Sequence, residues 1–192
     1  PIHFRCGEKD SAELLPHWRR EESTEPRPGG EVRRLSFADP DTGLAVVAEV
    51  RTFADFPAVE WVLRFRNDGP ADTPILADIQ PLDATFALPR DQGCRVHHAL
   101  GSECRIDDFA PQVTSLNPGA ADPQGAGRGR GNPVALRTHG GRSSNGALPF
   151  FNVERDGPAG VIGALGWTGD WEARFWREEN GDVRVQTGMQ RT

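Results

Sequence analysis

The amino-acid sequence predicts an all-β fold, a large antiparallel β-sandwich, from three observations. Apolar and polar residues alternate with a period of two through most of the chain, and turn residues interrupt the alternation roughly every ten positions. The 192 residues include 22 Gly and 16 Pro, which is heavy for a helical protein. Helical patterns are nearly absent, so parallel α/β architectures are excluded and a sandwich remains.

The N-terminal half contains the clearest alternating segments. Residues 35–37 alternate before the turn sequence Asp-Pro-Asp-Thr-Gly at 39–43, and residues 44–50 alternate after it. In 59–67 the apolar residues face one side and most charged residues face the other. The sequence Asn-Asp-Gly-Pro at 67–70 then ends that segment with residues typical of a hairpin turn. We therefore expect consecutive antiparallel strands in this half.

Further alternating segments follow in the rest of the chain. One begins at 75–79 and continues through 82–86 after Pro81 shifts its register. Four later segments repeat the pattern, at 150–154, 160–167, 171–177 and 183–189. The helical pattern at 11–15 is stopped by Pro16, which limits it to a single turn.

The length predicts one sizeable core, and we expect residues 1–192 to form a single β-sandwich domain. Residues 117–133 interrupt the alternation, because they are rich in Gly, Pro and Arg and contain almost nothing apolar. Such a segment cannot pack, so it is expected to be a flexible loop. Two interpretations stay open for it: a solvated surface insertion or a functional excursion.

Composition excludes several classes of function. A net charge of −6 argues against a general nucleic-acid binder, and no apolar run is long enough for a membrane-spanning helix. Cys94 and Cys104 can pair across a hairpin only in an oxidising compartment, and the cellular location stays open. Cys94, His97 and Cys104 lack the full ligand set of a structural zinc site. We expect no metal and no cofactor.

Asp107 and Asp108 are adjacent carboxylates that could do acid–base chemistry. Neighbours in an extended chain point to opposite faces, so these two would not act on one substrate atom. The two carboxylates of a glycosidase flank the scissile bond and usually come from different strands. The competing interpretation is that one Asp caps a turn while the other is solvated.

Two further segments have the chemistry of ligand recognition. The run Arg142, Ser143, Ser144 and Asn145 is dense in hydrogen-bond donors, so it suits a polyhydroxylated ligand, a partner's backbone, or a tight connection between strands. Trp167 and Trp171 flank a Gly turn, and planar rings beside short polar side chains are typical of sugar recognition. Either indole could equally pack between sheets, and Trp61 in its alternating segment is expected in the core.

Four segments occur in a recognisable order, at 53–61, 101–109, 141–146 and 166–171. Together they resemble the N-terminal domain of family 36 glycoside hydrolases, the α-galactosidase group, over most of the chain from about Phe53 to Met189. This resemblance implies a galactose-mutarotase-like supersandwich that precedes a catalytic (β/α)8 barrel. In that family the nucleophile and the acid/base are Asp residues of the barrel, while the N-terminal domain covers the barrel, helps the enzyme to oligomerise, and in some members lends loops to the active-site mouth.

A barrel needs about 250 residues, so no catalytic residue can be carried over to this chain. The missing initiator Met and the end of the chain within a strand predict a part of a larger protein. The expected partners are the catalytic barrel of the same or a companion chain, a carbohydrate, and further copies in a homo-oligomer. The candidate carbohydrate-binding residues are Asp107, Asp108, Arg142, Ser143, Ser144, Asn145, Trp167 and Trp171.

Two other functions stay open at this point. A free-standing carbohydrate-binding module would use Trp167, Trp171 and the loop at 142–145. A mutarotase or epimerase, suggested only by analogy of fold, would need a His and a Glu facing one pocket. His97, His98 and His139 have no evident carboxylate partner in the sequence.

Overall fold

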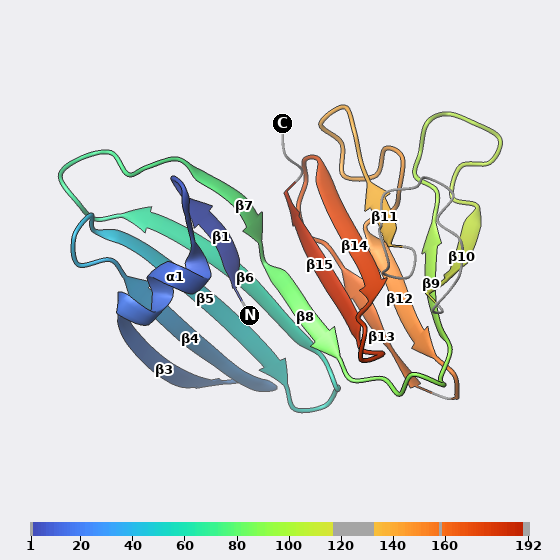
Figure 1. Cartoon of the computed structure of the whole chain (residues 1–192), viewed down its shortest axis with the longest axis horizontal. Helices are drawn as coiled ribbons and strands as arrows, with labels where there is room; N and C mark the ends of the chain where they lie inside the picture. The colour runs from blue at the N-terminus through green and yellow to red at the C-terminus, as the bar shows by residue number, and fades with distance from the viewer. Residues whose placement is uncertain (1, 117–132, 158, 190–192) are drawn as a thin grey trace. The chain divides into compact units, whose positions relative to one another are not determined.

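The computed structural model describes residues 2–116, 133–157 and 159–189. They divide into two compact units, an N-terminal unit of residues 2–81 and a C-terminal unit that begins at Leu82 (Figure 1). The interpretation of residues 1–192 as one sandwich domain stays a prediction. Apart from Pro133, the flexible loop predicted at 117–133 lies outside the described residues.

The N-terminal unit consists of two antiparallel sheets and a short helical segment. A four-stranded sheet has the order β3-β4-β5-β6, and a three-stranded sheet has the order β2-β1-β7. Their strands are β1 (His3–Cys6), β2 (Lys9–Asp10), β3 (Arg19–Arg27), β4 (Gly30–Ala38), β5 (Leu44–Phe53), β6 (Val59–Asn67) and β7 (Leu76–Gln80). The helical segment is α1 (Ser11–Leu14) followed by the 3₁₀ turn η1 (Leu15–His17). No helix among the described residues is long and apolar enough to cross a membrane.

The core of the N-terminal unit joins its two sheets. Phe4 from β1 is fully buried, and its ring meets the ring of Phe65 from β6 edge to face, with centroids 5.3 Å apart. Val46 of β5 pairs with Phe65 in the ladder and is also fully buried. The turn predicted between β4 and β5 is present: Gly43 has a φ of +78°, and an added Cβ would lie 2.5 Å from the backbone of Gly69. Only Gly fits this position.

The C-terminal unit consists of two four-stranded antiparallel sheets, with the orders β10-β9-β12-β13 and β11-β14-β15-β8. Their strands are β8 (Leu82–Phe86), β9 (Cys94–Ala99), β10 (Pro111–Ser115), β11 (Val134–Arg137), β12 (Phe150–Arg155), β13 (Ala159–Ala164), β14 (Trp171–Arg177) and β15 (Val183–Met189). Buried residues of both sheets form one core. In it the rings of Phe151 and Phe175 meet at 4.8 Å and 74°. The predicted all-β sandwich fold is confirmed.

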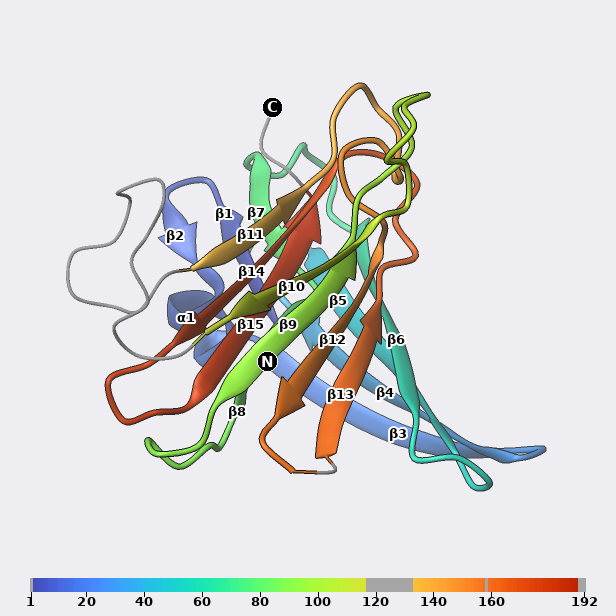
Figure 2. The ribbon, with the colours of Figure 1, turned by 90° about the vertical axis from the view of Figure 1, so that its right-hand side faces the viewer.

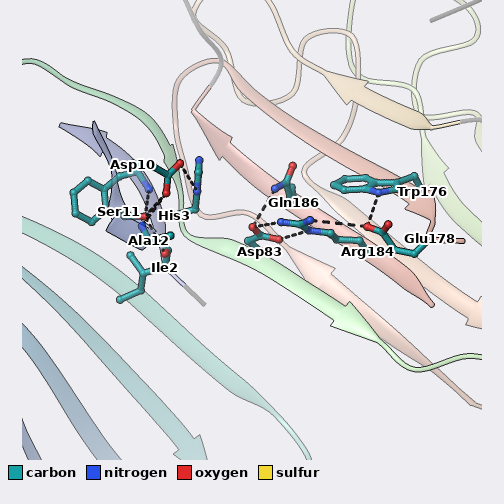
Figure 3. Close-up of polar contacts among 11 residues, drawn as sticks. Ile2, His3, Asp10, Ser11, Ala12, Asp83, Trp176, Glu178, Arg184 and Gln186 are labelled. Atoms are coloured by element: carbon teal, nitrogen blue, oxygen red, sulfur yellow. Dashed lines mark hydrogen bonds and ion pairs between the residues drawn. The ribbon is translucent and has the colours of Figure 1, made fainter. Parts of the chain in front are cut away.

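The face of β15 that points away from this core is polar. Asp83 of β8 accepts hydrogen bonds from Nε and Nη2 of Arg184, both at 2.8 Å, and from Nε2 of Gln186 at 3.1 Å (Figure 3). The guanidinium of Arg184 also lies 5.4 Å from the ring centroid of Trp176. A buried carboxylate is tolerated when it is paired and hydrogen-bonded in this way.

The structure differs from two predicted strand boundaries. The alternation predicted across Pro81 forms two strands of different sheets, β7 and β8, because proline has no N–H with which to continue a ladder. The strand predicted at 160–167 ends at Ala164. Leu165 donates its N–H to the carbonyl of Pro149, outside the ladder, and the chain continues as a loop.

Candidate functional site

Three loops lie together at one end of the C-terminal unit, at the top of Figure 2: residues 100–110, 138–149 and 165–170. They connect β9 to β10, β11 to β12, and β13 to β14. Because paired strands here are antiparallel, the start of β12 lies beside the ends of β9 and β13. We call this region the loop end. It contains every candidate binding residue except Trp171, which follows the last loop as the first residue of β14.

Hydrogen bonds donated by backbone N–H groups hold the three loops to one another. The N–H of Gly101 donates to the carbonyl of Gly146 at 3.0 Å, and the N–H of Ser102 donates to the carbonyl of Ser144 at 2.7 Å. The N–H of Gly141 donates to Oδ1 of Asp170 at 2.9 Å. Segments that are far apart in the sequence therefore form one connected surface.

Asp108 caps the turn in which it lies. Its carboxylate accepts hydrogen bonds from the N–H of Glu103 at 2.9 Å, the N–H of Cys104 at 3.0 Å and the hydroxyl of Ser102 at 3.3 Å. The N–H of Glu103 is the largest cause of a lowered pKa at Asp108, because it stabilises the ionised form. Cys104 and Phe109 adopt positive φ angles of 62° and 65° in this turn. The extended conformation assumed for Asp107 and Asp108 was wrong.

Asp107 forms an ion pair instead. Its Oδ1 accepts a hydrogen bond from Nε of Arg105 at 3.0 Å. These two residues line a small pocket of about 220 Å³ together with Leu100, Gly101, Glu103, Asp108 and Gly146. The volume is below the range of about 300–1,000 Å³ that is usual for small-molecule sites. The pocket can therefore take part of a ligand rather than enclose one.

The lowered pKa of Asp108 predicts that the 103–109 turn loosens in acid. A carboxylate whose pKa is lower in the folded state stabilises the fold above its unfolded pKa, about 3.9, and this stabilisation is lost as the pH falls through the folded value. In a ¹³C NMR titration the midpoint of the Asp108 carboxyl should lie below the ordinary value, and Ser102→Ala should raise it. An unchanged midpoint in Ser102→Ala would contradict the assigned hydrogen bond.

The loop at 142–145 is held mainly by its backbone; Arg142 is exposed, while Ser143, Ser144 and Asn145 are half-buried. The carbonyls of Ser143 and Ser144 accept hydrogen bonds from other segments, and Nδ2 of Asn145 donates to the carbonyl of His139 at 3.1 Å. The guanidinium of Arg142 is exposed and makes no ion pair with a described residue. The hydroxyls of Ser143 and Ser144 likewise make no hydrogen bond to the described part of the chain. These groups are the ones left available to a ligand.

The two indoles of the 166–171 motif have different environments. Trp171 is fully buried; its Nε1 donates to the carbonyl of Ser143 at 2.8 Å, and its backbone N–H donates to the hydroxyl of Thr138 at 2.8 Å. Trp167 is 49% exposed. Only Trp167 therefore offers a ring face to solvent, while Trp171 packs in the core and supports the 142–145 loop. In the N-terminal unit Trp61 is half-buried and donates its Nε1 hydrogen bond to Pro81.

Two histidines have carboxylate partners that the sequence did not show. Nε2 of His97 lies 2.6 Å from Oε2 of Glu154, and Nε2 of His139 lies 3.2 Å from Oε1 of Glu103. No carboxylate partner was evident for His97 or His139 in the sequence, because strand pairing and contact between loops are what bring these partners together. Glu103 lines the pocket, and with His139 it adds a polar pair to the loop end that no sequence spacing indicated.

The cysteines do not meet in the structure. Cys94 is buried in the core and Cys104 is exposed in its turn, and no disulfide joins these two described residues. Cys94 also lies on the opposite side of β9 from His97, since three positions separate them in a strand. Within residues 2–116, 133–157 and 159–189, no His, Cys, Asp and Glu side chains gather as a metal-binding group.

Comparison with known proteins identifies the fold. No family model and no curated protein matches the sequence. Among solved structures, the chain is similar to the GH36 α-galactosidase AgaA from Geobacillus stearothermophilus, with a TM-score of 0.61, 16% identity, and coverage of 99% of this chain and 24% of that one. It is also similar to AgaB from the same organism, with a TM-score of 0.64, 13% identity, and coverage of 98% and 26%.

A third similar structure is the α-galactosidase from Lactobacillus brevis, with a TM-score of 0.64, 16% identity, and coverage of 99% and 23%. The chain therefore spans about a quarter of the length of these enzymes. At such identities the likeness shows the fold. The resemblance noted from the four sequence motifs is confirmed at that level.

Proposed function

We propose that this chain, which shares its fold with about a quarter of a GH36 α-galactosidase, is the non-catalytic N-terminal domain of an α-galactosidase-like glycoside hydrolase. It packs on a (β/α)8 barrel of the same or a companion chain, supports homo-oligomerisation and shapes the sugar-binding mouth. The observation that carries this proposal is the extent of the structural match, in which 99% of this chain corresponds to only 24% of AgaA.

The carboxylates of the loop end support a non-catalytic role. A glycosidase needs a pair in which one carboxyl stays protonated, which requires a raised pKa. Asp108 has a lowered pKa because the N–H of Glu103 and further donors of its own turn hydrogen-bond to it. Asp107 is paired with Arg105, and Glu103 is paired with His139. Asp107, Asp108 and Glu103 are therefore engaged in contacts that hold the loop end together.

Side-chain groups of the loop end that are not engaged with the described part of the chain support a role at the mouth of a sugar site. The hydroxyls of Ser143 and Ser144 and the guanidinium of Arg142 can hydrogen-bond to sugar hydroxyls, while the exposed ring of Trp167 can stack on a C–H face. Asn145 follows Ser144 in the same loop, and Asp107 lines the pocket of the loop end. Asp108 and Trp171 were also candidate binding residues. Asp108 instead holds the turn at 103–109, and Trp171 holds the loop at 142–145.

The reading frame beyond Thr192 tests the proposal most directly. We expect it to encode about 250 residues of alternating strands and helices, as a barrel requires. The isolated chain should not hydrolyse a chromogenic α-galactoside. A stop codon after Thr192 with no barrel encoded nearby, or hydrolysis by the purified chain at enzymatic rates, would overturn the proposal.

A free-standing carbohydrate-binding module is the second candidate, and the exposure of Trp167 is the observation that favours it. By calorimetry such a module should bind galactosides with a millimolar or tighter Kd, and Trp167→Ala should abolish the binding. The control is Trp176→Phe, which keeps an aromatic ring on a different part of the unit. For the domain proposed above we expect no measurable binding without its barrel. If the chain binds galactosides measurably and Trp167→Ala removes this binding, the chain is a carbohydrate-binding module.

A further inference from the structure

We infer that β13 is a docking strand for a second copy of this chain, the two β13 strands pairing antiparallel across a two-fold axis. Such pairing specifies the surface for the homo-oligomerisation included in the proposed function and rests on that part of it. β13 is the last strand of its sheet and pairs only with β12 among the described strands. Its outer edge therefore presents backbone N–H and C=O groups that can accept another strand.

The composition of β13 is unusual for a free edge. Its sequence is Ala-Gly-Val-Ile-Gly-Ala, without a charge or a proline. Val161 is 42% exposed and Ile162 is 81% exposed. Monomeric proteins normally protect an edge strand with charged side chains, proline or a very short length, because an uncharged edge pairs with other strands. β13 has none of these protections.

The other sheet edges that the structure describes are protected. β3 and β6 carry several Arg and Glu residues, and β3 also contains Pro26. β10 begins with Pro111 and is otherwise polar apart from one valine. The shorter edge strands each carry charge: Lys9 and Asp10 in β2, Asp78 in β7, Asp83 in β8 and Arg137 in β11. Protection is thus missing at one edge rather than throughout the fold.

The strand is complementary to itself, which argues for a second copy as its occupant. A two-fold axis perpendicular to the sheet keeps each face on its own side, so a residue can lie opposite itself. With Ile162 on the axis, the exposed Val161 lies opposite Gly163 of the second copy, where no side chain stands in its way. Gly163 cannot be larger, because a Cβ there would lie 2.2 Å from the ring of Phe151.

The face of the sheet that carries Ile162 extends this apolar contact. Phe150 pairs with Ala164 and is 58% exposed on the same face as Ile162. In the register with Ile162 on the axis, Ala164 lies opposite Gly160 of the second copy. The small residues leave room for the Phe150 ring to lean across the junction. Two copies would in this way form one continuous eight-stranded sheet from the four-stranded sheet of each.

Sedimentation equilibrium of the whole chain, from low to high micromolar concentration, tests the pairing. We expect the wild type to approach twice the mass of one chain. Ile162→Asp places two like charges against each other on the axis and should weaken the dimer by more than about tenfold. The matched control is Val113→Asp: Val113 is 56% exposed and lies in the same cross-strand row as Ile162, but on the opposite edge strand β10. It should leave the dimer unchanged.

Cross-linking tests the register. Residues directly opposite in an antiparallel pair lie about 4.5–5.5 Å apart at Cα, which is within the range of a disulfide. In a Cys104→Ser background, which removes the exposed native thiol, Ile162→Cys should form an intermolecular disulfide on mild oxidation and Val113→Cys should not. Circular dichroism should show the same β-sheet spectrum for every variant, since both positions are exposed.

Two results would overturn the pairing: a wild type that stays monomeric at all concentrations, or a dimer that Ile162→Asp leaves intact. Neither result touches the non-catalytic assignment. That assignment fails instead if the reading frame lacks a barrel, whatever the mass of the isolated chain. The two failures are therefore distinguishable.

Discussion

Replacing Trp171 by alanine should lower the free energy of unfolding of the C-terminal unit by about 3–5 kcal/mol. The side chain is fully buried in the core of that unit, so truncation removes its packing and leaves a cavity. The indole N–H also donates to the carbonyl of Ser143, which would lose this partner. The loss should therefore extend to the loop at 142–145, where amide hydrogen exchange should become faster.

Trp167→Ala is the matched control for Trp171→Ala, because Trp167 is half exposed and belongs to the same motif. Its free energy of unfolding should stay within about 0.5 kcal/mol of the wild type. Urea unfolding followed by far-ultraviolet circular dichroism measures both variants without relying on the fluorescence of the residues removed. Equal losses in the two variants would contradict the division between a supporting and an exposed indole.

Phe151→Ala should also cost about 3–5 kcal/mol, whereas Phe150→Ala should cost less than about 0.5 kcal/mol. The two residues are neighbours in β12 and point to opposite faces of its sheet. Phe151 is 6% exposed and meets Phe175 of the facing sheet, while Phe150 is 58% exposed. Comparing the two variants therefore shows which face of β12 packs in the core, using two positions that are adjacent in the sequence.

Both variants of β12 should be compared by urea unfolding at one low protein concentration, so that self-association through β13 does not contribute. Gly163→Ala gives an independent check on the same contact, because the added methyl group would meet the ring of Phe151. It should destabilise the unit by about 1–3 kcal/mol, as overpacking does. A Phe150→Ala variant as unstable as Phe151→Ala would mean that the outer face of this sheet is packed as well.

The loop end is held together largely by contacts of the backbone. The hydrogen bonds that join its loops involve backbone groups, the carboxylate of Asp170 and the indole N–H of Trp171. The side chains not needed for this purpose, among them Arg142 and Trp167, are those exposed to solvent. Residues that hold a loop and residues exposed to solvent are thus adjacent in the sequence.

Much of the fold could be predicted from the sequence because one face of most strands is apolar. Alternation identified β5, β6, β14 and β15, whose apolar residues are buried or, in β6, partly buried on alternate positions. β3 was missed because nearly all its residues are exposed, so its sequence has no alternation to detect. The sequence motifs also singled out the segments that form the loop end, since Gly, Ser, Asp and Trp clustered where strands ended.

Tertiary structure alone decided which of those residues face solvent and which support the loops. The sequence could not distinguish Trp167 from Trp171, because burial depends on the sheet packed opposite rather than on neighbours along the chain. The pairing of His139 with Glu103 and the capping of the turn by Asp108 likewise depend on where the loops fold. Local patterns of apolar residues determine where the strands form. The contacts at the loop end join segments that are far apart in the chain, and the sequence does not show which of these segments meet.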